Sequence, residues 1–99
     1  MSEDILRVTF GSEALHRLAT ELDYSPTTWK RDVVKAYRKR VQLILAVRDQ
    51  GDLHALRGLG LREVPDDDVD LFSMRLTDES RLIVAFTSDR HAIIHEILD

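Results

Sequence analysis

The last third of the chain contains three strand-like segments joined by very short connections, and this constrains the fold more than any other feature. Residues 71–77 alternate between apolar and polar side chains, as a half-buried strand does. Residues 81–87 (RLIVAFT) are almost continuously apolar, which is typical of a central strand, and residues 92–98 form the third segment. Connections this short can join antiparallel strands but not parallel ones. The pattern therefore predicts an antiparallel meander.

The start of the chain predicts a short strand followed by a helix. Residues 5–10 are rich in β-forming side chains and end at Gly11. Ser12 comes next as a helix N-cap residue. Leucine and alanine side chains then recur at helical spacing as far as Leu22.

A second, longer helix is predicted after Ser25-Pro26, because proline favours the first helical position behind a serine cap. Its apolar stripe, at steps of three and four residues, consists of Trp29, Val33, Tyr37, Val41, Ile44 and Leu45. Gly51 is expected to end this helix, and Asp52 to cap a short helical turn after it. Residues 61–64 add a further strand-like segment before the meander.

Together these elements predict one α+β domain that spans residues 1–99. The expected architecture is an N-terminal strand and two helices packed on a curved antiparallel sheet. A chain of this length can bury a real core but leaves no room for a second domain.

The composition excludes several classes of protein and separates the charges along the chain. No cysteine is present, which rules out disulfides, thiolate chemistry and cysteine-ligated metals and suits the cytoplasm. Neither a secretory signal nor an apolar run long enough to span a bilayer is seen, so no membrane association is expected. The formal net charge is −4, but residues 30–48 carry seven basic side chains and one acid, whereas residues 63–79 carry seven acids and one base. A basic helical side and an acidic loop are therefore predicted.

Several segments, in chain order, resemble the HigB-type killer proteins of the RelE/ParE toxin superfamily. They are the helix 32–42 (DVVKAYRKRVQ), the Asp-Leu-x-x-Leu segment 51–56, the Ser-x-Arg strand 72–76, the Arg-Leu-Ile segment 81–83 and the final strand 94–99. The similarity covers nearly the whole sequence from about Val8 onward. Each motif is weak alone, but the ordered set is fairly specific.

This resemblance implies a RelE-like fold and the toxin role of a type II toxin–antitoxin system. Such a toxin would be a ribosome-dependent mRNA interferase, an endoribonuclease that inhibits translation and needs no cofactor. Its partners would be the ribosome, mRNA and a cognate antitoxin, expected to be a helix-turn-helix protein similar to HigA.

The resemblance also suggests catalytic residues. Arg81 corresponds to the arginine that the family places at its active site, and Arg75 matches a second arginine of the pattern. Arg62 stands where some relatives have a histidine, and Asp99 matches the aspartate of a terminal Asp-Tyr-His. Because RNA cleavage by a 2′-hydroxyl requires cations around a crowded phosphate, Arg81 is the expected phosphate clamp. The alternative is a strand arginine in a surface ion pair.

Basic residues of the long helix form a second set of candidates. In the family context Lys35, Arg38 and Lys39 would contact RNA, with phosphate charges as their partners. The alternative is an ordinary solvated helix face.

Other positions depart from the family pattern and put its chemistry in question. Glu63, Pro65 and Asp68 stand where relatives have basic residues, and Ser80 replaces a tryptophan. Relatives also continue with tyrosine and histidine after the position of Asp99. Weak or absent nuclease activity is therefore expected. The alternatives are a RelE-fold protein that only binds an antitoxin, and a ParE-like inhibitor that binds gyrase.

Histidines and acidic clusters are the other residues that could substitute for the missing groups. His54, His91 and His95 could act as acids or bases, although surface or packing roles are the simpler reading. The acids of residues 66–70 imitate the start of a calcium loop but lack its glycine and its bidentate glutamate. His91, His95 and Glu96 lack the helical placement and the further ligand of a zinc site. No metal is therefore predicted.

Overall fold

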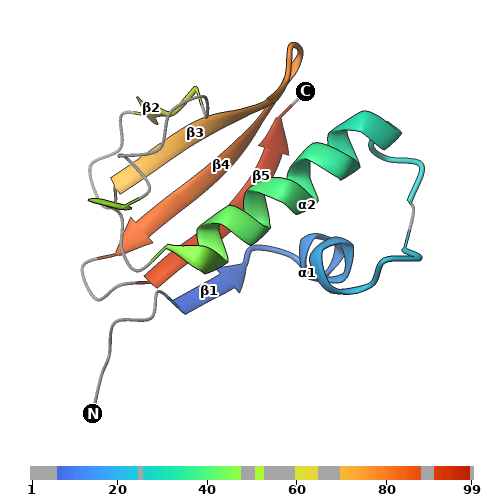
Figure 1. The fold of residues 1–99 in the computed structure, drawn as a ribbon, viewed down its shortest axis with the longest axis horizontal. Coiled ribbons are helices and arrows are strands. Elements are labelled where there is room, and N and C mark those ends of the chain that lie inside the picture. The colour runs from blue at the N-terminus through green and yellow to red at the C-terminus, as the bar shows by residue number, and fades with distance from the viewer. Residues whose placement is uncertain are drawn as a thin grey trace.

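The computed structural model describes residues 7–24, 26–47, 51–52, 60–64, 70–87 and 91–98. Its elements, in chain order, are β1 (Arg7–Phe10), α1 (Glu13–Thr20), α2 (Arg31–Ala46), β2 (Arg62–Val64), β3 (Asp70–Thr77), β4 (Ser80–Thr87) and β5 (His91–Leu98). Two helices and a five-stranded sheet make an α+β structure, as predicted. Figure 1 shows α2 lying along one face of the sheet, with α1 beside it.

The strands lie in the order β1-β5-β4-β3-β2, and the predicted meander is confirmed: β2, β3, β4 and β5 pair antiparallel. The expectation of a wholly antiparallel sheet is wrong at β1, which pairs parallel to β5 with Phe10 opposite Ile94. Both helices and three strands separate β1 from β5 along the chain, so the connection permits either direction. The local alternation of apolar and polar residues carries no information about whether β1 pairs parallel or antiparallel to β5.

One face of the sheet, called here the helix-covered face, supplies half of a single hydrophobic core. Met74 of β3 pairs with Leu82 of β4, and the core residues of these two strands follow from this alternation. In β5 the register shift at Ile83 and Val84 breaks the alternation, so that Ile97 as well as Ile94 reaches the core. The core contains Leu15 and Leu18 of α1, Val33, Val34, Tyr37, Val41 and Ile44 of α2, and Phe72, Met74, Leu76, Leu82, Val84, Phe86, Ala92, Ile94 and Ile97 of the sheet. The other face of the sheet is called here the opposite face.

The predicted cap of the first helix is confirmed, because the hydroxyl of Ser12 accepts a hydrogen bond from the backbone N–H of Leu15 (3.2 Å). The predicted start of the second helix is wrong: residues 27–28 form a turn and α2 begins only at Arg31. Both turn residues are threonines, whose branched side chains disfavour helix. Trp29 and Val34 occupy the two positions of a hydrophobic staple around the true N-cap, Lys30, and both line the pocket at the start of α2.

Gly51 does not act as the predicted helix terminator. α2 ends at Ala46, and both Gly51 and Asp52 have helical backbone conformation. The helical turn that Asp52 was expected to cap lies outside the described residues.

Two irregularities interrupt the antiparallel ladders. The β3–β4 register shifts between Arg75 and Thr77, and the β4–β5 register shifts between Ile83 and Val84. At the first of these bulges, Nε of Arg40 on α2 donates a hydrogen bond to the carbonyl of Arg75 (3.1 Å). The bulge thus provides a backbone acceptor that ties the helix to β3.

Tyr37 joins the two helices. Its side chain is fully buried, and its hydroxyl donates a hydrogen bond to the carbonyl of Leu15 in α1 (2.8 Å). Burial raises the pKa of Tyr37 well above its ordinary value of 10.0, because the phenolate would lose hydration. This contribution to stability is present below pH 10.0 and is lost as the pH rises above it.

We expect Tyr37→Phe to lower the free energy of unfolding by about 0.5–1.5 kcal/mol near neutral pH, through loss of one buried hydrogen bond. Above the ordinary tyrosine pKa, the parent should lose up to about 1.4 kcal/mol per pH unit that the variant does not lose. Urea denaturation of both proteins over a range of pH measures the difference. A gap that stays constant into the alkaline range would show that Tyr37 does not resist ionisation.

Candidate functional site

Three arginines that the sequence singled out come together on the opposite face of the sheet. Arg75 of β3 pairs with Arg81 of β4, and Arg62 of β2 pairs with Ser73, the residue two positions before Arg75. Strand alternation therefore turns all three arginines away from the helices. With Gly60 they line one surface pocket of about 430 Å³, called here the arginine pocket.

Arg81 is half-buried and is held along one edge of its guanidinium. Nε donates to Oγ of Ser73 (2.8 Å), and Nη2 donates to the carbonyl of Ser73 (3.2 Å) and to the carbonyl of Gly60. No described residue accepts a hydrogen bond from Nη1. Within the described residues, Arg81 is thus oriented by neutral groups, and the two N–H donors of Nη1 have no acceptor there and can serve an anion.

The electrostatics of the pocket favour an added negative charge. The pKa of Arg81 is lowered first by partial burial and then by the positive charges of Arg62 and Arg75. In the described segments that line the pocket, no carboxylate forms an ion pair with any of these arginines. The cluster is therefore a set of like charges that a bound phosphate would neutralise.

Gly60 was predicted only to break the chain, but it shapes the pocket. Its φ is +63°, and a Cβ at this position would lie 3.1 Å from Cβ of Arg75. A glycine is needed both for the left-handed backbone and for the close approach to β3. This conformation brings the Gly60 carbonyl to Arg81.

Ser73 is the residue that sequence reasoning missed. It is a buried polar side chain on the opposite face, and its hydroxyl positions Arg81. The Ser-x-Arg pattern of 73–75 was the available signal, but the prediction assigned a role only to its arginine. Ser80, at the position of the family's tryptophan, is also buried, and its hydroxyl pairs with that of Thr77 (2.7 Å).

The acids near the pocket are placed differently from the expectation. Glu63 pairs with Phe72, so alternation directs it away from the face that carries Arg62, and it forms no ion pair with the arginines. Asp78 and Glu79 line the pocket at the β3–β4 turn, and Glu79 lies 3.7 Å from Nζ of Lys30. Residues 65–69, with the other loop acids, lie outside the described residues.

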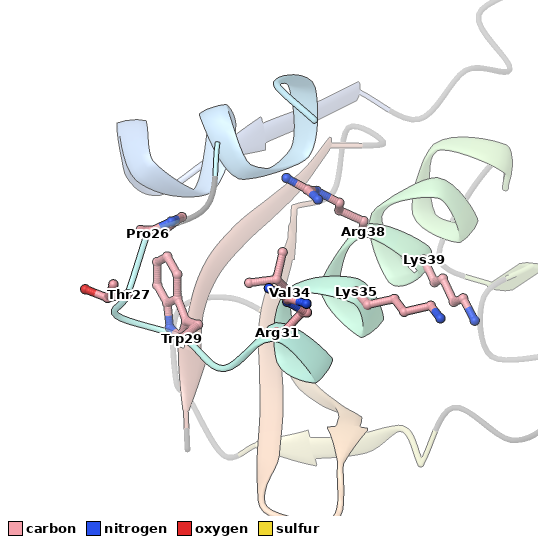
Figure 2. Close-up of a pocket in the computed structure, with 8 residues that line it drawn as sticks. All are labelled: Pro26, Thr27, Trp29, Arg31, Val34, Lys35, Arg38 and Lys39. Carbon is pink, nitrogen blue, oxygen red and sulfur yellow. The ribbon is translucent and has the colours of Figure 1, made fainter. Parts of the chain in front are cut away.

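The basic residues of α2 divide into two groups. The guanidinium of Arg38 points toward α1 and donates to the carbonyls of Leu18 (2.8 Å), Glu21 (3.1 Å) and Tyr24 (3.1 Å). It therefore provides donors to backbone carbonyls in the last turn of α1 and in the segment that follows it. Lys35 and Lys39 are exposed and point away from Arg38 in Figure 2, without an ion pair to any described residue.

A second pocket lies between α2 and the segment before it. Figure 2 shows its wall, which is formed by Pro26, Thr27, Trp29, Arg31, Val34, Lys35, Arg38 and Lys39. One side is apolar, with the indole of Trp29, and the other carries the exposed lysines. The surface thus combines an aromatic ring with several cations.

The remaining catalytic candidates are distributed as follows. His91 bonds to Oγ1 of Thr9 (2.8 Å) and pairs with the far end of β4, about 20 Å along the strand from Arg81. His95 lies at the β5 bulge and is exposed. Asp99 and His54 lie outside the described residues, although Leu98 pairs directly with Arg81.

Within the described residues, no group of three or more histidine, aspartate or glutamate side chains is placed to hold a metal ion. None of the helices described is both long and apolar enough to cross a membrane. The arrangement that remains is an arginine cluster that can bind a phosphate and stabilise charge developing on it.

Comparisons of this chain with protein-family models, with curated proteins and with solved structures found no match. The geometry of the arginine pocket therefore carries the functional argument.

The contacts of Arg38 predict a role in stability that its neighbour Lys39 does not share. We expect Arg38→Ala to lower the free energy of unfolding by about 1.5–3 kcal/mol, because partly buried carbonyls lose a charged donor. Lys39→Ala should change it by no more than about 0.5 kcal/mol. Urea denaturation of both variants tests this, and equal effects would contradict the assigned clamp.

Proposed function

We propose that this chain is the toxin of a type II toxin–antitoxin pair, that it acts on mRNA during translation, and that a helix-turn-helix antitoxin holds it inactive. The observation that carries the proposal is the arginine pocket. Arg75 and Arg81 match arginines of the RelE/HigB pattern, Arg62 stands where some relatives have a histidine, and the three arginines lie together on one face of the sheet. A phosphodiester is a ligand of suitable charge for such a cluster.

The pocket suits the electrostatic part of RNA cleavage. When a 2′-hydroxyl attacks the adjacent phosphate, negative charge builds on the non-bridging oxygens. Nη1 of Arg81 offers two donors toward such an oxygen, while Ser73 and Gly60 hold the other edge of the guanidinium in place. Since those partners are neutral, they orient Arg81 without cancelling its charge.

A second function, binding without cleavage, is favoured by a specific observation. Among the described residues, no histidine or carboxylate is hydrogen-bonded to the arginines of the pocket, and arginine itself is a poor proton acceptor. General acid–base catalysis typically contributes a factor of about 10²–10⁴, so a site without it would be slow. The second candidate is therefore a toxin that binds RNA or a protein target and cleaves poorly.

We expect Arg81→Ala to abolish most of the growth inhibition and most of the ribosome-dependent cleavage of a reporter mRNA. Loss of a single preorganised donor at a developing oxyanion typically costs about 10²–10³ in rate. Arg81→Lys is the matched control for charge, since it keeps the cation but loses the fork that contacts Ser73 and Gly60.

Both Arg81 variants must first show cooperative unfolding and expression equal to the parent. Full toxicity of folded Arg81→Ala would refute the arginine pocket as the functional site. The ParE-like alternative would be favoured if Arg81→Ala loses toxicity while the parent cleaves no mRNA and inhibits gyrase.

The family's loop chemistry gives a separate prediction. We expect Glu63→Lys combined with Pro65→Lys and Asp68→Arg to cleave faster than the parent, because the three changes restore cations where relatives carry them. Charges within about 8–10 Å act on each other at physiological salt, and residue 63 is adjacent to Arg62. Initial rates on ribosome-bound reporter mRNA compare the two proteins. No gain in the triple variant, or a parent as fast as an efficient toxin, would contradict the loop argument.

A further inference from the structure

Three surface pockets join into one continuous path. The pocket beside Trp29 shares Lys35 and Lys39 with a third pocket, which lies between α2 and β3. This third pocket shares Thr77 with the arginine pocket. A ligand can therefore pass from Trp29, along α2 and around the edge of β3 at Thr77, to Arg81 without leaving the lined surface.

Cations mark the whole path. Arg31, Lys35 and Lys39 are spaced four residues apart on α2 and so lie in one row, with Arg40 next to them. The path then reaches the cluster of Arg62, Arg75 and Arg81. We name the surface made by these seven residues the basic track.

Among the described residues that line the three pockets, three acids oppose these charges, and they are Asp32, Asp78 and Glu79. Asp32 accepts a hydrogen bond from the backbone N–H of Val33 (2.8 Å), and Glu79 is 3.7 Å from Lys30. The track is therefore strongly positive although the chain as a whole carries a formal net charge of −4.

We propose that the basic track binds a single RNA strand, which runs from the arginine pocket over the edge of β3 and along α2 to Trp29. This rests on the proposed function and extends it to the path of the substrate. A flexible polyanion satisfies three features together: a row of separated cations, a bend around a strand edge, and an aromatic side chain at the far end. The hydrophobic core is not involved, because all seven residues of the track are exposed or half-buried.

The single tryptophan of the chain reports on the far end of the track. Trp29 fluorescence is followed during titration with 2′-O-methyl oligouridines, which cannot be cleaved by 2′-hydroxyl attack, from a dinucleotide to a dodecanucleotide. A strand too short to span both ends binds at the arginine pocket without reaching Trp29. We expect quenching, and a rise in affinity, only above a threshold length.

Lys35→Gln with Lys39→Gln removes two charges from the middle of the track. The matched control, Arg7→Gln with Arg17→Gln, removes two charges from β1 and α1, outside the track. Both variants are first checked for an unchanged thermal unfolding midpoint. Affinity measured over a range of salt gives the number of phosphate contacts, with a slope of about 0.7 per contact for a single strand.

For the lysine variant we expect the salt slope for the dodecanucleotide to fall by about 1.4, which equals two contacts at about 0.7 each. Its affinity for the dodecanucleotide should fall to that for the short strand, and quenching of Trp29 should be lost. Binding of the short strand should be unchanged. The control variant should resemble the parent at every length.

The track is refuted if the lysine and control variants bind the dodecanucleotide alike, or if Trp29 is quenched equally by the shortest strand. If Lys35→Gln with Lys39→Gln weakens binding of an acidic peptide but not of RNA, the surface serves a protein partner instead. This result also overturns the proposal. Failure of the track and failure of the proposed function give different results. If the arginine pocket is not the functional site, Arg81→Ala leaves binding of the short strand intact.

Discussion

Burial of one face of the β3–β4–β5 meander under α1 and α2 is the constraint on which the rest of the structure depends. Phe72, Met74 and Val84 can enter the core only if the alternate residues of their strands face the other way. Arg75 and Arg81 are among those alternate residues, so packing the core exposes them together. A shift of register by one residue would bury both arginines and expose the core, at a prohibitive cost.

Exposure alone would leave Arg81 as a mobile surface cation, but its guanidinium donates hydrogen bonds to neutral acceptors of Ser73 and Gly60. They reduce the conformational freedom of the guanidinium before any ligand arrives, which lowers the entropic cost of binding. Partial burial and, after it, the positive charges of Arg62 and Arg75 lower the pKa of Arg81, and a bound anion would offset both effects. The pocket thus combines preorganisation with a cluster of like charges.

α2 shows how one helix serves three purposes through its faces. Tyr37 and the apolar stripe fill the core, Arg38 satisfies the carbonyls at the end of α1, and Lys35 with Lys39 remains exposed beside the surface pockets. The three residues 37, 38 and 39 are consecutive in sequence but differ in environment, because each step along a helix rotates the side chain by about 100°. A basic run on a helix is therefore not a single functional unit.

Periodicity and turn signals determined the α+β class, the order of elements and the antiparallel meander, because these follow from local alternation and short connections. The tertiary structure alone decided the parallel pairing of β1, the clamp made by Arg38, and the contacts of Gly60 and Ser73 with Arg81. Each of these depends on segments far apart in the chain, as with Gly60 and Arg81 or Leu18 and Arg38. Such contacts arise only when the core has brought the segments together, and no spacing within one segment encodes them.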